Sequence, residues 1–384
     1  MEITTAARAG PAAALPAVTG REAARAFVDE HIAPRAEEYD QLGAIPEDLL
    51  TRLGQAGLWA PFLPTGMGGS GMDMVTLGEI HEELGRGCSS VRSLLTVHSM
   101  LAWAVYRWGT PGQRERWGRA LAGGHVLGAF CLSEPGAGSD TSAITTTATP
   151  SGDGWRLRGS KTWITGGQRA GLFLVFARGP ASTVALLVPR TAAGVTVRPI
   201  DDMLGTRASM LAGIRFDDVS LGPEALLGPA GFTSGMVLSS VLDLGRYSVA
   251  AGSVGIVQAC LEACAGYAAT RRAGGSLLRD LPLIQAKLSD MVTDVRAGRL
   301  LVAEAGRLKD AGDPATIMAT WVAKYFAATA AARHAAEAVQ VHGASGCSRD
   351  YPVARYYRDA KVMEIIEGSN EIQRITIAEQ AYRK

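Results

Sequence analysis

Hydrophobic and polar positions alternate with a helical period in the first third of the chain. Between about residues 21 and 124, apolar residues recur every three to four positions, as in amphipathic helices. Thr110, Pro111 and Gln113 supply an N-cap, a first-turn proline and a capping-box partner for one of these helices. We therefore predict an N-terminal helical bundle. Its predicted helices span residues 21–32, 46–58, 89–109 and 110–121.

The pattern changes near residue 126. Short runs rich in β-branched and aromatic residues follow, and Gly, Pro and Asp separate them, which is typical of strands joined by turns. This block is predicted to be a small β-barrel or sandwich. Its predicted strands span residues 155–165, 172–179, 183–190, 195–200 and 211–219.

Long helical patterns return after about residue 231. Long helices with short connections favour a second bundle, a four-helix bundle that also associates with other copies of the chain. The predicted helices span 232–272, 281–311, 315–341 and 351–363, followed by a terminal helix after Asn370. The predicted fold class is therefore α+β and multidomain. Its parts are a flexible tail (1–20), an N-terminal helical domain (21–125), a central β domain (126–230) and a C-terminal bundle (231–384).

Composition and charge exclude several classes of function. The 38 Lys and Arg residues against 37 Asp and Glu give a net charge of +1, so no basic field favours nucleic acid or an anionic membrane. No uninterrupted apolar run reaches the ~18 residues of a membrane span, and the start lacks the pattern of a signal peptide. We expect a cytoplasmic protein. Its five scattered cysteines suit reduced thiols, and no His-rich set completes a metal site with Cys260 and Cys264.

The segment EIIEGSNEIQR (364–374) contains Glu367 followed by Gly368. Asn370, followed three residues later by Gln373, is typical of a capping box at a helix N-terminus. Acidic residues near a helix N-terminus are favoured by the helix macrodipole without any catalytic duty. This segment alone therefore favours a solvated acid ahead of a helix, with a catalytic carboxylate as the alternative.

Three dispersed segments together carry a resemblance to a known family. They are LSEPGAGSD (132–140), KTWITGG (161–167) and IIEGSNEIQR (365–374). Set in the order helical block, β block, helical block, they resemble the flavin-dependent acyl-CoA dehydrogenase family. The resemblance implies the acyl-CoA dehydrogenase fold, an FAD cofactor and oxidoreductase activity on a CH–CH bond. Further matching segments are 63–73, 204–219, 242–246, 340–346 and 357–361.

The implied chemistry gives Glu367 a role. Dehydrogenation of a thioester across Cα–Cβ needs a base for the acidic α-proton and an acceptor for the β-hydride. The resemblance implies that FAD is the acceptor, that Glu367 is the base, and that the backbone N–H of Glu367 helps to hold the thioester carbonyl. Some branches of the family place the base just before the arginine of the segment LDLGR (242–246). That position is Gly245 here, which favours Glu367.

The resemblance also implies residues that hold the cofactor and the substrate. Plain core packing is the alternative for Phe130, Leu132 and Trp163, and a structural ion pair is the alternative for Asp243 and Arg246. The implied cofactor-binding residues are Phe130, Leu132, Ser133, Ser139, Trp163, Ile164, Thr165, Arg271, Gln340, Gly343, Ala344, Ser369 and Glu371. The implied substrate-binding residues are Ser139, Asp243, Arg246 and Gly368.

One segment departs from the family pattern. Ala273, Gly274 and Pro282 stand where the family has Gln, Phe and Gln, residues that contact the FAD diphosphate and adenine across a subunit interface. Their loss predicts weaker FAD binding unless other residues compensate. A helix C-cap formed by Gly274 and Gly275 is the purely structural interpretation. Because Arg271 and the 340–344 segment would reach a neighbour's cofactor, a homodimer or homotetramer is expected.

Within the family, the segments 87–117 and 357–373 are most similar to dehydrogenases that act on acyl groups tethered to acyl carrier proteins in polyketide and nonribosomal peptide pathways. The resemblance implies a hydroxyacyl substrate on the way to hydroxymalonyl or methoxymalonyl extender units, or a small aminoacyl thioester. A short-chain acyl-CoA thioester is the main alternative. An electron acceptor flavoprotein or oxygen would reoxidise the FAD. A non-catalytic scaffold and an oxygen-using variant remain as other classes of function.

Overall fold

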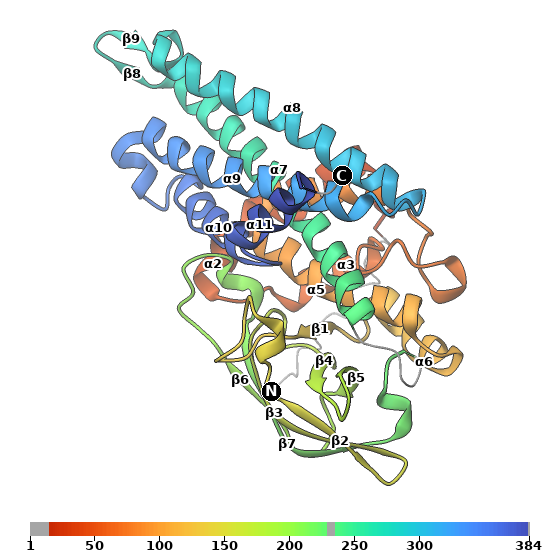
Figure 1. Cartoon of the computed structure of the whole chain (residues 1–384). Helices are drawn as coiled ribbons and strands as arrows, with labels where there is room; N and C mark the ends of the chain where they lie inside the picture. Colours follow the sequence, from red (N-terminus) through yellow and green to blue (C-terminus); the bar gives the residue numbers. More distant parts are fainter. Residues whose placement is uncertain (1–14, 229–234, 383–384) are drawn as a thin grey trace, which may run out of the picture.

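A computed structural model of the chain describes residues 15–228 and 235–382. Figure 1 shows the strands of the middle region gathered at one end of the molecule and the helices of both flanking regions packed together above them. The predicted order of a helical, a β and a second helical region is confirmed. Of the predicted tail, residues 1–14 lie outside the described residues. Val18 is buried and donates its backbone N–H to the Ala56 carbonyl, so the chain already packs before residue 20.

The N-terminal region is helical, as predicted, and the capping box of Thr110 and Gln113 is confirmed. Two helices, α2 and α4, were not predicted. In α4 the residues from Leu77 to Gly87 are nearly all buried, polar ones included, so no amphipathic pattern is visible in the sequence. The helices are α1 (Arg21–His31), α2 (Ala36–Leu42), α3 (Glu47–Gln55), α4 (Met74–Gly87), α5 (Ser89–Trp108) and α6 (Pro111–Ala122).

The middle region is built on one seven-stranded sheet with the order β1-β4-β2-β3-β7-β6, and β5 pairs with β4. The five predicted strands are confirmed as β3 to β7. Strands β1 and β2 were missed because β1 has only four residues, without apolar and polar alternation, and β2 contains Pro150, which argues against a strand. The strands are β1 (Gly128–Cys131), β2 (Thr147–Ser151), β3 (Gly154–Ile164), β4 (Leu172–Arg178), β5 (Thr183–Pro189), β6 (Val195–Pro199) and β7 (Ala212–Leu221).

The C-terminal region contains the predicted long helices. They are α7 (Gly235–Thr270), α8 (Pro282–Asp310), α9 (Thr316–His342), α10 (Val353–Ile365) and α11 (Asn370–Gln380). Helix α7 is long and apolar enough to cross a membrane by length and composition, but 67% of its most apolar window is buried inside the molecule. It packs against α4, α5, α8 and α9, and packing in the core accounts for its apolar composition.

Two predictions of local capping are wrong. The N-cap of α11 is Ser369, and the Asn370 side chain instead accepts from Lys324 and donates to Thr329. The Gln373 amide donates to the carbonyls of Glu367 and Gly368, so the predicted capping box does not form. The bonds of Asn370 to α9 and of Gln373 to the preceding loop replace the bonds of a capping box.

The Gly274 and Gly275 pair is not a helix C-cap. It forms the two-residue turn of a small hairpin between β8 (Arg272–Ala273) and β9 (Ser276–Leu277). Both glycines have positive φ, +56° and +86°, which hairpin turns of this kind require. Pro282 is the first residue of α8, where its missing N–H has no helical partner to lose.

Candidate active site

Glu367 lies on the short connection between α10 and α11, in a backbone conformation with φ of +56°. Positive φ is uncommon for residues other than glycine, and such strain persists only where the surroundings hold it. The Arg246 Nε donates to the Glu367 carbonyl at 3.0 Å, and the Gln373 amide donates to the same oxygen at 3.3 Å. The loop is therefore fixed through its backbone, which leaves the Glu367 carboxyl group free for another task.

The Glu367 carboxyl group fits into a space that α7 leaves at Gly245. A Cβ atom at Gly245 would lie 2.4 Å from Glu367 Oε2 and 2.9 Å from Met100 Sδ. Oε2 is buried, and it has no hydrogen-bond partner among the described residues. A buried polar oxygen without a partner is rare and calls for an explanation such as a bound ligand or a catalytic role.

Burial raises the pKa of Glu367 to about 7, although the charges of Arg246, Arg92 and Lys324 oppose the rise. Removal from water disfavours the ionised form of a carboxyl group. A general base works best with a pKa near the operating pH. The carboxyl group is thus suited to take up a proton at neutral pH.

Lys324 of α9 completes the support of this loop and was missed from the sequence. Its Nζ donates to the Gly368 carbonyl at 2.8 Å and to Asn370 Oδ1 at 3.2 Å. Burial lowers the pKa of Lys324 to about 8, with Glu367 acting in the opposite direction. The available sequence signal for Lys324 was its spacing. It follows Thr320 by four residues, so both side chains lie on the same, buried face of α9, where a lysine is unusual.

The segment after β1 and the end of β3 form a second group of predicted residues. The Thr162 N–H donates to the Ser133 carbonyl at 2.9 Å, and Lys161 Nζ donates to the Leu132 carbonyl at 2.9 Å. Lys161 also forms a buried ion pair with Glu134, at 2.7 Å. Lys161 and Glu134, both missed from the sequence, therefore hold the two predicted flavin segments together.

Trp163, at the end of β3, combines exposure with an unusual backbone. Its side chain is 55% exposed and its φ is +59°. An exposed tryptophan is not core packing, so that alternative is wrong for Trp163. Ile164 and Leu132 are buried, whereas Phe130, Ser133 and Thr165 are half-buried and Ser139 is exposed. Phe130 packs against Phe176, with ring centroids 5.5 Å apart.

Helix α5 contacts both groups. A Cβ at Gly166, next to Thr165, would lie 2.6 Å from Leu94 Cδ1 of this helix. Met100 of the same helix borders the space at Gly245 that receives Glu367. The structure thus brings the 163–165 and 367 segments to one buried helix.

A third group of predicted residues lies elsewhere in the chain. Arg271 lines a hollow of about 460 Å³ at the end of α7, together with Tyr267 and His342, whose rings stack 4.3 Å apart. Gly343 and Ala344 follow His342 directly, and Gln340 precedes it on an exposed part of α9. Figure 1 shows this end of α7, next to the β8–β9 hairpin, far from the strands of the middle region.

The remaining predicted residues have the following surroundings. Asp243 forms an ion pair with Lys309 of α8, the structural pair that was the alternative for this residue. The Arg246 guanidinium lies over the Trp321 ring, 4.0 Å from its centroid. Ser369 precedes α11, and Glu371 is exposed in its first turn.

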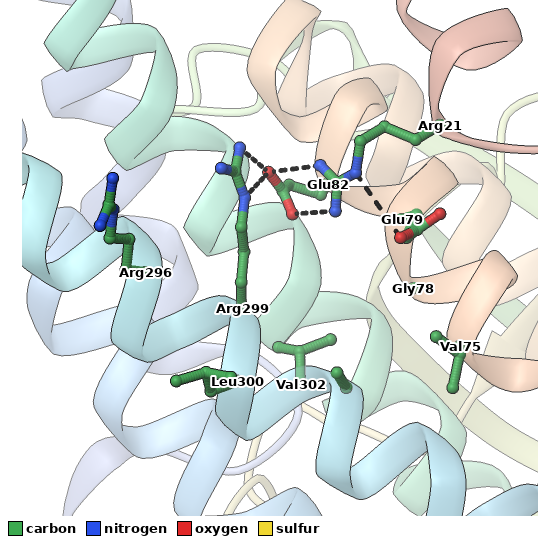
Figure 2. A pocket seen from close by; sticks show the side chains of 10 residues that line it. Arg21, Val75, Gly78, Glu79, Glu82, Arg296, Arg299, Leu300 and Val302 are labelled. Carbon is green, nitrogen blue, oxygen red and sulfur yellow. Dashed lines mark hydrogen bonds and ion pairs between the residues drawn. The ribbon is translucent and has the colours of Figure 1, made fainter.

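A second hollow, of about 450 Å³, lies between α1, α4 and α8 and is not part of this site. Figure 2 shows Glu82 between Arg21 and Arg299 in this hollow, with ion pairs to both. The Glu82 carboxylate is therefore already neutralised by two guanidinium groups. No residue predicted for catalysis or for cofactor binding lines it.

Models of three domains of one protein family match the chain in order. They are the N-terminal domain (residues 19–125), the middle domain (129–219) and the C-terminal domain (233–382) of acyl-CoA dehydrogenase. The chain is 36% identical to the mitochondrial short-chain specific acyl-CoA dehydrogenase of Rattus norvegicus over 364 residues, which cover 93% of this chain and 88% of the rat protein.

Solved structures are similar over nearly the whole length. FkbI, whose structure is described as serving biosynthesis of the methoxymalonyl extender unit of the polyketide Fk520, has a TM-score of 0.87 at 36% identity, covering 93% of this chain and 99% of FkbI. A glutaryl-CoA dehydrogenase of Mycobacterium smegmatis in complex with FADH2 has a TM-score of 0.89 at 29% identity, covering 94% of this chain and 93% of that one.

Proposed function

The chain belongs to the acyl-CoA dehydrogenase family of FAD-dependent oxidoreductases that act on CH–CH bonds, and we propose that its substrate is a small hydroxyacyl or aminoacyl group bound as a thioester to an acyl carrier protein. The predicted fold class and the FAD cofactor are thereby confirmed at the level of the family. The acyl group, its carrier and the roles of single residues are the proposal.

The observation that carries the chemistry is the Glu367 carboxyl group. It is buried against Gly245, one of its oxygens has no partner among the described residues, and burial raises its pKa to about 7. We assign Glu367 as the general base that takes the α-proton of the thioester onto its carboxylate. Its strained loop is held by Arg246 and Lys324, and its backbone N–H is the proposed donor to the thioester carbonyl.

The residues present fit an FAD cofactor. Trp163 exposes a large aromatic face in a costly backbone conformation, as expected of a side chain that covers a planar ring. FAD supplies the acceptor for the β-hydride when bound. The proposed ring contacts are Phe130, Leu132, Ser133, Trp163, Ile164 and Thr165. Ser139, Asp243, Arg246 and Gly368 are the proposed substrate contacts, and Asp243 would act from within its ion pair with Lys309.

We propose that the hollow around Arg271 holds the phosphate and adenosine part of a neighbour's cofactor. Gly245 and Thr270 are separated by 25 residues of one helix, about 38 Å at 1.5 Å per residue. That span exceeds the length of a dinucleotide, so one cofactor cannot reach from the Glu367 site at Gly245 to the Arg271 hollow of the same chain. Arg271, Gln340, Gly343 and Ala344 would act in a homodimer or homotetramer, with Ser369 and Glu371 close to the same cofactor.

The carrier protein is supported by the likeness to FkbI and by the segments that resemble carrier-linked dehydrogenases. The rat relative supports the alternative, a short-chain acyl-CoA thioester. An electron acceptor flavoprotein or oxygen is proposed to reoxidise the FAD. A non-catalytic scaffold is disfavoured by the geometry at Glu367.

A competition experiment tests the proposal. Wild type receives the same acyl group on a carrier protein and on CoA, and Glu367→Gln is the control. We expect kcat/KM to be at least about tenfold higher on the carrier protein, because contacts between the two proteins add binding in the transition state. Added salt should reduce this advantage.

The Glu367→Gln variant should bind FAD and lose turnover by several orders of magnitude, since an amide cannot accept the proton. Equal or faster turnover of the CoA thioester would reject the carrier. Turnover by Glu367→Gln above about a tenth of wild type would reject Glu367 as the base, and a colourless wild type that cannot be reconstituted with FAD would favour the scaffold.

A further inference from the structure

A basic surface lies where α5 ends and α6 begins. The segment 107–119 contains four arginines and one acid, Glu115, and so has a net charge of +3, whereas the whole chain has a net charge of +1. The rest of the chain is therefore slightly acidic, and this short segment is a local source of positive potential. We call its arginines the arginine patch; they are Arg107, Arg114, Arg116 and Arg119.

The arginines of this patch are not paired with carboxylates. Among the described residues, no ion pair includes any of the four, and Arg114 Nε is buried without an acceptor. Arg107 lies over the Trp103 ring, 5.7 Å from its centroid, and Arg116 lies over the Trp117 ring at 4.6 Å. A guanidinium group that stacks on an aromatic face keeps its N–H edge available for a carboxylate. The patch thus has unused donors for an anionic partner.

Helices α5 and α7 run antiparallel, and their contacts fix the register. Thr96 Oγ1 contacts Ser248 Oγ at 2.6 Å, and seven residues later on α5 the Trp103 indole N–H donates to Ser240 Oγ at 2.8 Å. Seven residues forward on α5 thus correspond to eight residues backward on α7. One further turn in the same directions leads from Trp103 to Arg107, and from Ser240 to the first turn of α7.

The seam between α5 and α7 joins the candidate base to the basic surface. At one end, Met100 borders the space at Gly245 that receives the Glu367 carboxyl group. At the other end, Arg107 is exposed and lies opposite the first turn of α7, where the apolar Met236 is 54% exposed. Met100 and Arg107 are seven residues apart, about 10 Å along α5 at 1.5 Å per residue. The pantetheine arm of a thioester can span this distance.

Helix α6 is anchored beside the start of α7 and presents arginines outward. The buried Gln113 amide donates to the carbonyl of Leu226, shortly before α7 in the chain, at 2.9 Å. Figure 1 shows α6 next to the first turns of α7 and away from the β8–β9 hairpin. Arg116 and Arg119 are three residues apart and both exposed, so they share the outer face of α6. The patch therefore lies near the open end of the seam, away from the subunit contact proposed at Arg271.

From this geometry we propose that the arginine patch is the docking surface for an acidic helix of the carrier protein. The pantetheine arm then follows the α5–α7 seam to Glu367. Arginine suits this role because its planar N–H edge binds a carboxylate through two parallel hydrogen bonds. Met236 adds an apolar contact beside the charged groups, a combination that protein interfaces share.

This inference rests on the proposed function, and within it selects a carrier protein over CoA. Four guanidinium groups on two helices fit the several carboxylates of a helix better than the phosphates of one CoA molecule. The electron acceptor is the other partner that could use this surface, and the experiments below separate the three.

The first experiment measures binding without turnover. The probe is a dye-labelled, acidic polyketide acyl carrier protein that bears its pantetheine arm without an acyl group, and fluorescence anisotropy gives its dissociation constant from the FAD-loaded enzyme. Arg116→Glu combined with Arg119→Glu should weaken binding by at least tenfold, because two attractive charges become repulsive. Arg107→Glu alone should weaken it by at least threefold. Arg116→Lys combined with Arg119→Lys keeps the charges and should lose less than threefold.

Arg52→Glu combined with Arg198→Glu is the matched control. It makes the same change of net charge at two exposed arginines of α3 and β6, outside the patch. It should change the dissociation constant by less than threefold. Added salt should weaken binding by wild type more than binding by the Arg116→Glu, Arg119→Glu variant.

The second experiment compares one acyl group on the carrier protein and on pantetheine, which has no protein to dock. The Arg116→Glu, Arg119→Glu variant should lower kcat/KM at least tenfold with the carrier thioester and less than threefold with the pantetheine thioester. Equal losses with both would overturn the docking surface, and so would a loss confined to reoxidation by the electron acceptor. An equal loss with the CoA thioester would assign the patch to the phosphates of CoA and overturn the carrier assignment.

Absence of carrier binding by wild type, or unchanged binding in the Arg116→Glu, Arg119→Glu variant, would also overturn the proposal. Both side chains are exposed, and Arg107→Glu is a separate variant, so the test does not depend on the folding of one protein. A wild type that binds the carrier through the patch but oxidises neither thioester would reject the dehydrogenase function and support the docking surface.

Discussion

The proposed base, Glu367, can accept a proton only when it is ionised, so its raised pKa should set the pH dependence of the reaction. With a pKa of about 7, the ionised fraction grows about tenfold between pH 6 and pH 8. We expect kcat/KM of wild type to rise by about this factor over the same range, measured with a saturating electron acceptor. A flat profile, or a midpoint close to the ordinary value of 4.5, would show that a different group limits the rate.

The raised pKa of Glu367 lowers stability as the pH rises, whereas it is expected to increase the rate. The folded state holds the proton of Glu367 more tightly than the unfolded chain, so this contribution to stability is complete below pH 4.5 and is lost as the pH rises through 7. Glu367→Gln, which cannot ionise, is the control: its unfolding free energy should lack this component of the pH dependence.

Gly245 leaves the space that the Glu367 carboxyl group occupies, so Gly245→Ala tests the position of that group. A Cβ at 2.4 Å from Oε2 must displace the carboxyl group. We expect kcat to fall about a hundredfold, because misplacing a reacting group by about 1 Å has an effect of this size. The measurement is steady-state kinetics together with flavin content.

Gly112→Ala in α6 is the matched control, since a Cβ there meets nothing within 4 Å. It should retain wild-type kinetics. Unchanged kcat in Gly245→Ala would mean that the carboxyl group acts from another position.

At the scale of elements, one ion pair joins β3 to the segment after β1. The side chains of Lys161 and Glu134 are 0% and 2% exposed. Burial acts to raise the pKa of Glu134, but hydrogen bonds from Lys161, Thr145 and Thr146 hold it at about 2. Removing the lysine leaves a buried carboxylate without its cation. Lys161→Met should therefore cost about 3–5 kcal/mol of unfolding free energy and reduce flavin retention.

Chemical denaturation and flavin absorbance after gel filtration measure both effects. Lys361→Met removes the lysine of an exposed pair with Glu364 and serves as the control. It should cost less than about 1 kcal/mol, as exposed pairs do. If the two variants lose equal stability, the buried pair does not hold these segments together.

At the scale of the whole molecule, the separation of Arg271 from the rest of the site predicts a shared site between subunits. Arg271→Ala should release flavin and weaken the oligomer together, because one charge-assisted contact would support both. Flavin occupancy and light scattering on the same sample measure the two effects. Arg279→Ala changes an exposed arginine beyond the β8–β9 hairpin that does not line the hollow, and it should change neither. Full flavin occupancy with an unchanged oligomer in Arg271→Ala would show that the contact does not exist.

The sequence by itself determined the type and approximate bounds of the long elements. Helical periodicity over twenty or more residues is a local property, and so is the Thr110 capping box. The motif around Glu367 can also be read in a short stretch of sequence. The same holds for Gly245, which stands where some branches of the family have the alternative base. The four-residue β1, the proline-containing β2 and the helix α4, with its buried polar residues, did not give a clear local pattern.

Only the tertiary structure decided what surrounds Glu367. Gly245, Met100, Arg92 and Lys324 come from three helices far apart in the sequence, and no local pattern couples them to one carboxyl group. The raised pKa follows from burial, which exists only after these helices pack. Asn370 shows the same principle, since its side chain bonds to α9 rather than capping its own helix. Local rules place each residue on an element, while contacts between distant elements fix its charge, its partners and the space it occupies.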